Sequence, residues 1–263
     1  MYHLRLIGLF ARASFLEESA YRANFFLSVV YSLLNLLTGV LAIVVLFGQV
    51  TQINGWEFNQ TLALLGVYLT LGALRSLVFG PSLDSMAGMD GEIWSGRLDF
   101  SLMRPLNTQF LVSFRKWRYH ALFDLALGFT VILIAAMRLH ESLAVGNLLS
   151  FLLALGAGLA ILYAILLAFS ALAFFSPGVM FTWVFDGVFQ MARYPLGLYP
   201  RWLQWMLTWI VPVGVITTLP AQALNGAASP AALAGMLVLA LLLCSTASLL
   251  FRYGLRQYKS ASS

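Results

Sequence analysis

Charged residues and cysteine are scarce in this chain of 263 residues. Only 10% of the residues are charged, one is a cysteine and 61% are hydrophobic, and the mean hydropathy is +0.87. This balance excludes a water-soluble fold, because a soluble domain has about 25% charged residues. The single cysteine, Cys244, excludes an intrachain disulfide. The length suffices for roughly six membrane-crossing helices of ~20 residues, but not for a large soluble domain as well.

The motifs of common catalytic sites are also missing. The sequence has no G-x-x-x-x-G-K phosphate loop, no G-x-S-x-G nucleophile elbow and no H-E-x-x-H zinc motif. His3, His120 and His140 are far apart and fall at different ends or sides of the predicted spans, so they predict no metal site. We therefore expect that the chain is not an enzyme and binds no cofactor itself.

Long uncharged stretches predict an all-α polytopic membrane protein. Their apolar character is continuous rather than alternating, which favours helices over strands. We predict six transmembrane helices, over residues 25–47, 61–79, 119–137, 148–175, 202–219 and 231–251.

The basic residues predict the orientation, since lysine and arginine in short loops are retained in the cytoplasm. With both termini cytoplasmic, four segments hold every lysine and arginine except Arg75 and Arg138. These segments are 1–24, 80–118, 176–201 and 252–263. A seventh crossing at 179–191 would place one of the terminal clusters of basic residues outside the cell, so we expect this stretch on the cytoplasmic side. The net charge of +5 thus reflects topology, and we expect no nucleic-acid partner.

The first 22 residues have apolar side chains at roughly helical spacing, with Arg5, Arg12 and two glutamates elsewhere. This pattern is typical of a helix that lies in the membrane interface. A short soluble helix before the membrane is the alternative.

The connection between the second and third spans contains a stretch, 91–106, that is dense in features. Gly91 and Gly96 permit turns, and Pro105 stops a helix. Its apolar residues are Ile93, Leu98, Leu102 and Leu106, and its charged residues are Glu92, Arg97, Asp99 and Arg104. Such a stretch suits docking into a groove of another protein. A solvated loop whose charges only set the topology is the alternative.

Several blocks of the sequence resemble, in order and spacing, type-2 ABC export permeases of the six-span branch without a fused ATPase domain. They are the lead into the first span at 21–25, the central loop at 96–105, the lead into the fifth span at 194–200, that span and its outer end at 210–221, and residues 258–261. The resemblance extends over nearly the whole chain.

The resemblance implies a permease subunit of an ATP-driven exporter in the bacterial cytoplasmic membrane, forming half of a path for a hydrophobic or amphipathic substrate such as a drug, lipid or metabolite. Its partners would be two copies of an ABC ATPase, which bind ATP and Mg, and a second permease, identical or homologous. Residues 1–24 would form an elbow helix, and the loop 80–118 would contain a coupling helix.

The implied coupling residues are Gly91, Glu92, Ile93, Gly96, Arg97, Leu98, Asp99, Leu102, Arg104 and Pro105. In this interpretation the charged members pair with the rim of the ATPase, while Ile93, Leu98 and Leu102 fill its groove.

For the translocation path the candidates are Ser32, Asn35, Trp209 and Asn225. Ser32 and Asn35 belong to a small and polar stripe on the first span, for which close helix packing is the alternative. Residues 220–230 are apolar but broken by turn residues, which predicts a re-entrant outer hairpin, with a simple short loop as the alternative.

Three ionisable residues fall within apolar segments: Arg75, Asp124 and Asp186. Arg75 can extend toward the inner membrane surface, or it can meet Asp124 or Asp186 across helices. Asp84 lies nine residues further on, on the opposite face of a continuous helix, and is therefore not expected as its partner.

Two other classes of function stay open. A membrane-embedded lipid-modifying enzyme would bring His, Asp or Glu residues together at one depth, and the sequence shows no such group. A secondary transporter would usually have inverted repeats, and none is visible.

Overall fold

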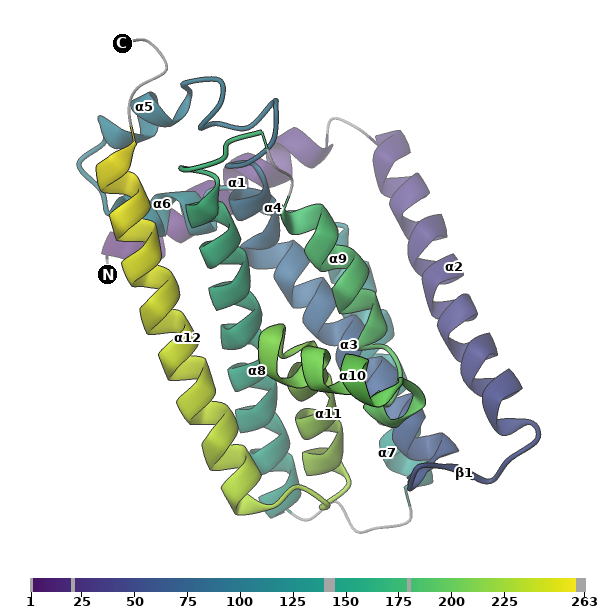
Figure 1. Cartoon of the computed structure of the whole chain (residues 1–263). Helices are drawn as coiled ribbons and strands as arrows, with labels where there is room; N and C mark the ends of the chain where they lie inside the picture. Colours follow the sequence, from purple (N-terminus) through teal and green to yellow (C-terminus); the bar gives the residue numbers. More distant parts are fainter. Residues whose placement is uncertain (1, 20–21, 140–144, 179–180, 259–263) are drawn as a thin grey trace.

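The structure is a computed structural model that describes residues 2–19, 22–139, 145–178 and 181–258. Its elements are α1 (Tyr2–Ser19), α2 (Arg22–Phe47), β1 (Gln52–Ile53), β2 (Trp56–Glu57), α3 (Phe58–Val78), α4 (Gly80–Asp84), α5 (Leu98–Leu102), α6 (Thr108–Phe114), α7 (Ala121–Arg138), α8 (Val145–Leu172), α9 (Phe181–Met191), the 3₁₀ helix η1 (Leu196–Leu198), α10 (Arg201–Trp205), the π-helix η2 (Met206–Ile210), α11 (Val213–Leu224) and α12 (Pro230–Gln257). The long helices form one bundle, with α1, α4, α5 and α6 at one end of it (Figure 1).

Five helices are long and apolar enough to cross a membrane: residues Ala23–Phe47 of α2, and the whole of α3, α7, α8 and α12. They coincide with five of the six predicted spans to within a few residues, which confirms these predictions. The start of α1 and the end of α12 lie at the same end of the bundle, here called the terminal end (Figure 1).

Helix α3 forms the centre of the bundle and is buried along most of its length, from Thr61 to Leu77. It packs most closely against α7, and two glycines make this approach possible. A Cβ atom placed on Gly66 would lie 2.7 Å from Ile132 Cγ1, and one on Gly128 would lie 2.8 Å from the backbone nitrogen of Thr70. Small residues allow helix backbones to come together in this way.

Helix α9 lies alongside α3 with one face buried and the other exposed, since Trp183 is 76% and Val184 60% exposed. The assignment of 176–201 to a cytoplasmic segment stays a prediction, which this course along a membrane-capable helix does not favour. The side chains of Phe185 and Phe189 are buried, and the rings of Phe189 and Tyr68 lie 5.0 Å apart. Farther along, the Asn54 side chain donates a hydrogen bond to the carbonyl of Gly197. Since Asn54 precedes α3, the chain from α9 to η1 follows α3 toward the end opposite the termini (Figure 1).

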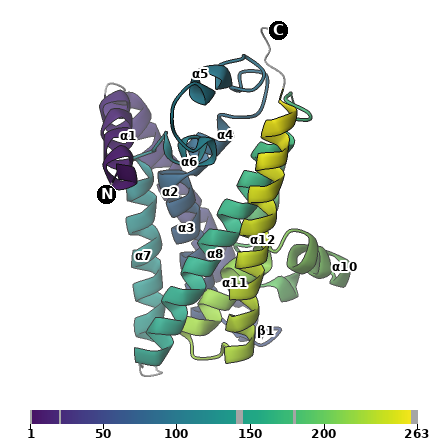
Figure 2. The same ribbon diagram turned by 90° about the vertical axis from the view of Figure 1, so that its left-hand side faces the viewer.

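The fifth predicted span, 202–219, is not one continuous helix. Helices α10 and η2 meet α11 at a bend of 88°, and α10 projects sideways from the bundle (Figure 2). The break lies at Val211 and Pro212. Proline has no N–H to donate and disfavours helical geometry at the residue before it, and Val211 is indeed extended, with φ −123° and ψ 91°. Either this bent pair is one broken span or it forms a re-entrant loop.

The segment 220–230 contains less loop than its composition suggested. Pro220 lies within α11, which continues to Leu224, and α12 begins at Pro230 with the Ser229 hydroxyl accepting a hydrogen bond from the backbone N–H of Ala232 at 3.1 Å. Only residues 225–229 connect the two helices. The re-entrant outer hairpin at 220–230 stays a prediction.

Two smaller elements close the fold. The short hairpin of β1 and β2 turns at Asn54 and Gly55, both with positive φ, an Asn-Gly pair that favours such turns. Helix α1 crosses the terminal end of the bundle (Figure 1). Its Glu18 carboxylate accepts hydrogen bonds from the backbone N–H groups of Tyr119 and His120, at 2.6 and 3.0 Å. These groups precede α7, so α1 is tied to the start of that helix.

Candidate functional sites in the terminal loop and in a polar pocket

The connection between α3 and α7 is a folded unit rather than a solvated loop. Glu92 lies at its centre, buried, and its carboxylate pairs with Arg115 and with Lys116, whose Nζ lies 3.5 Å away. The Ser85 hydroxyl donates to the same carboxylate oxygen at 3.2 Å. Glu92 lies in the first half of the connection and the two basic residues lie near its end. These contacts therefore hold the two halves of the connection together.

The two glycines of this connection have the structural roles expected of turns. Gly96 has a φ of +71°, a conformation that side chains disfavour. A Cβ on Gly91 would lie 2.6 Å from the carbonyl oxygen of Ala87. Both positions therefore require glycine for the shape of the loop.

The predicted coupling residues divide into an internal and an exposed group. Glu92, Ile93 and Leu98 are buried within the protein's own fold, so in this conformation they offer almost no surface to a partner. The physical reason is that the loop is long enough to bury its own apolar seam. Arg97, Leu102, Arg104 and Pro105 are exposed, and Asp99 is half-buried.

Three large apolar residues of the same loop are exposed instead, and the sequence analysis missed them. Trp94 is 56% exposed, Phe100 71% and Met103 82%. Phe100 and Met103 flank the buried Ser101 on α5 and its end, with Arg104 next in the chain. We refer to Trp94, Phe100 and Met103 as the apolar tip. The signal that could have found it is the helical period of α5, in which Leu98 and Ser101 face inward.

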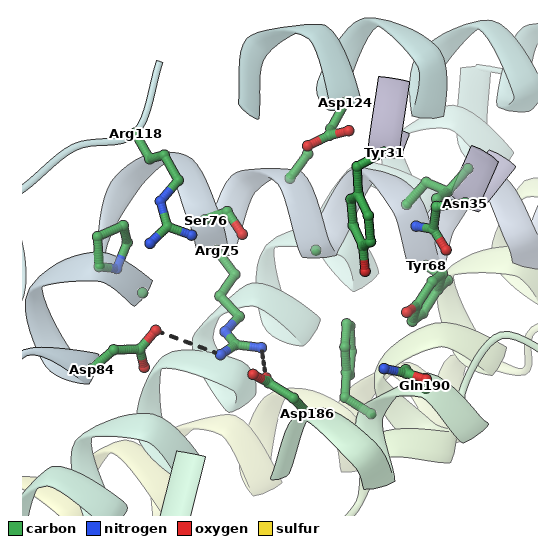
Figure 3. Close-up of a pocket in the computed structure, with 16 residues that line it drawn as sticks. Tyr31, Asn35, Tyr68, Arg75, Ser76, Asp84, Arg118, Asp124, Asp186 and Gln190 are labelled. Atoms are coloured by element: carbon green, nitrogen blue, oxygen red, sulfur yellow. Dashed lines mark hydrogen bonds and ion pairs between the residues drawn. The ribbon is translucent and has the colours of Figure 1, made fainter. Parts of the chain in front are cut away.

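The second site is a polar pocket of about 260 Å³ between α2, α3, α7 and α9 (Figure 3). On one side Arg75 pairs with Asp186 of α9, one of the three alternatives left open by the sequence, and with Asp84, 3.9 Å away. The contact with Asp84 corrects the sequence argument: α3 ends at Val78 and the chain turns before α4, so the two residues do not share one helix. Burial raises the pKa of Asp84, while the charge of Arg75 opposes this rise.

A second arginine lies deep in the bundle, although the sequence analysis counted it among the cytoplasmic basic residues. The Arg193 guanidinium lies over the ring of Tyr68, 5.3 Å from its centroid, and donates to the Asn35 side chain. Tyr68 and Asn35 lie near the middle of α3 and α2. Two neutral partners thus accommodate this charge inside the bundle.

The four candidate path residues do not come together. Ser32 and Asn35 lie on the face of α2 turned toward the bundle, and Asn35 lines the pocket. Trp209 is 73% exposed on η2, and Asn225 is buried at the end of α11. Only the first two belong to the same cleft.

Within the described residues no group of three or more His, Cys, Asp or Glu side chains could hold a metal ion. The predicted features that involve Tyr21, His140 or residues 259–261 lie outside the described part of the chain, as do residues 179–180.

A helical bundle with five or six membrane-capable spans is the fold of a multi-pass membrane protein, here with a braced loop at the terminal end and a polar pocket among the spans. Residues 33–262 match the family described as ABC-2 family transporter protein. The chain therefore belongs to the ABC-2 family and is a permease component of a transporter, as the resemblance implied. Permeases of this family generally pair with an ABC ATPase. No curated protein and no solved structure matches the chain.

Proposed function

We propose that this chain is the permease subunit of an ATP-driven exporter in the bacterial cytoplasmic membrane. It forms half of the path for a hydrophobic or amphipathic substrate and works with a second permease and two ATPase subunits. In this proposal both termini are cytoplasmic, α1 is the elbow helix, and the connection between α3 and α7 receives the ATPase.

The observation that carries the proposal is the apolar tip on a braced loop. Exposed aromatic and methionine side chains next to arginines are typical of the centre of a protein interface. Arg97 is held in the loop by a hydrogen bond to the Asp90 carbonyl and one to the Ser95 hydroxyl at 3.0 Å, and Arg104 is exposed beside the tip. Because the ion pairs of Glu92 hold the loop together across its width, little ordering is needed when a partner binds.

The coupling role now falls on the exposed members of the predicted set, Arg97, Leu102, Arg104 and Pro105, together with the apolar tip. Gly91, Glu92, Ile93, Gly96 and Leu98 support them from within. This division keeps the expected interface and changes which side chains form it.

The test is purification of the tagged chain from its native membrane. We expect an ABC ATPase to co-purify and to hydrolyse ATP. The double substitution Phe100→Ala and Met103→Ala should reduce the ATPase recovered by at least about tenfold, since two exposed anchors are lost. As a control, Trp205→Ala removes an exposed aromatic residue of α10, remote from the tip, and should have no effect. Recovery of the native chain without any ATPase would overturn the proposal.

A further inference from the structure

The polar pocket continues toward the terminal end into a second cavity of about 380 Å³. The two cavities share Tyr31, Ser76, Arg118 and Asp124. The second one lies between the first turns of α2 and the first turns of α7. Together the two cavities reach the size of pockets that hold small ligands, roughly 300–1,000 Å³. We call them the α2–α7 groove.

Two opposite charges line this groove without pairing. Among the described residues Asp124 forms no ion pair; its polar neighbours are Ser32 and His120, and the His120 ring is paired with Glu18. Arg118 likewise has no carboxylate within 4.0 Å in the described part of the chain, and it interacts only at longer range with the charge of Asp84. Both residues approach the pocket from the side opposite Asp84 and Asp186 (Figure 3). They contrast with Arg75, which already has two carboxylate partners.

The position of the two charges suits a ligand with an ammonium and an anion held apart. Asp124 is half-buried one turn inside α7, where an uncompensated carboxylate is costly. Arg118 is exposed, and its backbone N–H donates to the Leu77 carbonyl near the end of α3. The charges therefore lie where membrane helices begin and end, at the depth of lipid headgroups. With Arg75, Asp84 and Asp186, which line the same groove, the formal charges sum to −1, and this disfavours a ligand of high net charge.

An apolar cavity of about 460 Å³ adjoins the same region, lined by Phe15, Phe25 and Tyr119 among others. Leu27 and Ser28 of α2 line the groove itself, and Phe25 and Phe26 are exposed on the same helix. Acyl chains attached to a headgroup in the groove thus find apolar surface beside it. A small soluble zwitterion would leave this surface unused.

We propose that the α2–α7 groove binds the headgroup of a zwitterionic aminophospholipid, with its ammonium on Asp124 and its phosphate on Arg118. The assignment concerns binding by this chain and does not depend on whether an ATPase drives transport.

Native mass spectrometry of the delipidated full chain tests the proposal by titration with phosphatidylethanolamine and with phosphatidylglycerol of the same acyl chains. Phosphatidylglycerol has the phosphate but no ammonium, so we expect phosphatidylethanolamine to bind about tenfold more tightly. Asp124→Asn should abolish this preference. Arg118→Gln, a change at an exposed residue, should weaken the binding of both lipids about tenfold.

Two variants with the same change of charge outside the groove serve as controls. Asp90→Asn lies in the exposed loop and Arg252→Gln on the exposed surface of α12, and neither should alter lipid binding. Equal affinity for the two lipids in the native chain overturns the proposal. Lipid affinities of the Arg118→Gln variant that equal those of the Arg252→Gln control also overturn it. Free phosphoethanolamine that displaces the lipid at equal concentration would also overturn it, since the ligand would then be a soluble zwitterion.

Discussion

Helices α7 and α2 both lie against α3, but they are attached to it by different means. Glycines 66 and 128 bring the backbones of α3 and α7 together, and the contact is apolar around Ile132. Helix α2 is mostly exposed. Gly39 packs against Leu65 at one point, and farther along, Asn35 holds Arg193 across a polar pocket.

The difference shows which part of the bundle is fixed and which can yield. An apolar seam of close backbones loses dispersion contacts as soon as it separates, so it opens only at high cost. A helix held by a few polar contacts beside a cavity separates at lower cost. The structure therefore places a rigid α3–α7 core beside a more loosely held α2.

The largest effect is expected from Gly128→Leu. A Cβ at this position already lies 2.6 Å from Thr70 Oγ1, so the longer side chain must push α3 and α7 apart. We expect a loss of about 3 kcal/mol or more of folding free energy, measured as a lower melting temperature in detergent. Gly156→Leu on α8 is the matched control, since a Cβ there meets nothing within 4 Å. Equal loss in the two variants would contradict a special role of the α3–α7 seam.

A smaller effect is expected from Arg193→Met, which removes the hydrogen bond to Asn35 and the contact with the Tyr68 ring. These contacts contribute about 1–2 kcal/mol to the attachment of α2. Spin labels at the exposed Leu37 of α2 and Leu133 of α7, with Cys244 replaced by alanine, should give a broader distance distribution in the variant. Arg252→Met should leave the distribution unchanged. An unaltered distribution in Arg193→Met would show that α2 is held by other contacts.

The smallest effect is expected at Glu18, which binds the start of α7. Burial raises the pKa of this carboxyl, but the hydrogen bonds from Tyr119 and His120 lower it further, so that the net pKa lies below the ordinary 4.5. Its contribution to stability is therefore complete above pH 4.5 and is lost as the pH falls through the lowered value. Glu18→Gln should cost at most about 1 kcal/mol at neutral pH. The difference in melting temperature should vanish in acid, and a constant difference would exclude titration of Glu18 as its cause.

The sequence predicted the spans well because a long uncharged run has few alternatives to a membrane helix, as in α2 and α12. It failed where a charge is satisfied by tertiary contacts. The basic-residue pattern predicts Arg193 on the cytoplasmic side, since nothing in the linear sequence shows that the Tyr68 ring and the Asn35 side chain receive its guanidinium. The break at Pro212 had a local signal in the proline itself. For the side-by-side course of α9 and α3 the sequence offered only the possible pairing of Arg75 with Asp186.

The loop residues show the same limit. The sequence indicated that 91–106 is special, and its turn glycines were identified from residue type alone. Which face of the short helix α5 points inward depends on the folding of the whole connection. The sequence therefore predicted Ile93 and Leu98 as surface residues, whereas the structure buries them and exposes the apolar tip. The sequence offered two aspartates, Asp124 and Asp186, as ion-pair partners of Arg75. The structure selects Asp186 and adds Asp84.

The brace around Glu92 has a mechanical consequence. Its partners, Arg115 and Lys116, stand just before the start of α7, and the backbone N–H of Lys116 donates to the Ser82 hydroxyl at 2.6 Å, just after α3. Direct ion pairs and hydrogen bonds thus join the middle of the loop to the segments that follow α3 and precede α7. If an ATPase binds at Phe100 and Met103, as proposed above, these links predict that a force applied there moves both spans together rather than bending the loop.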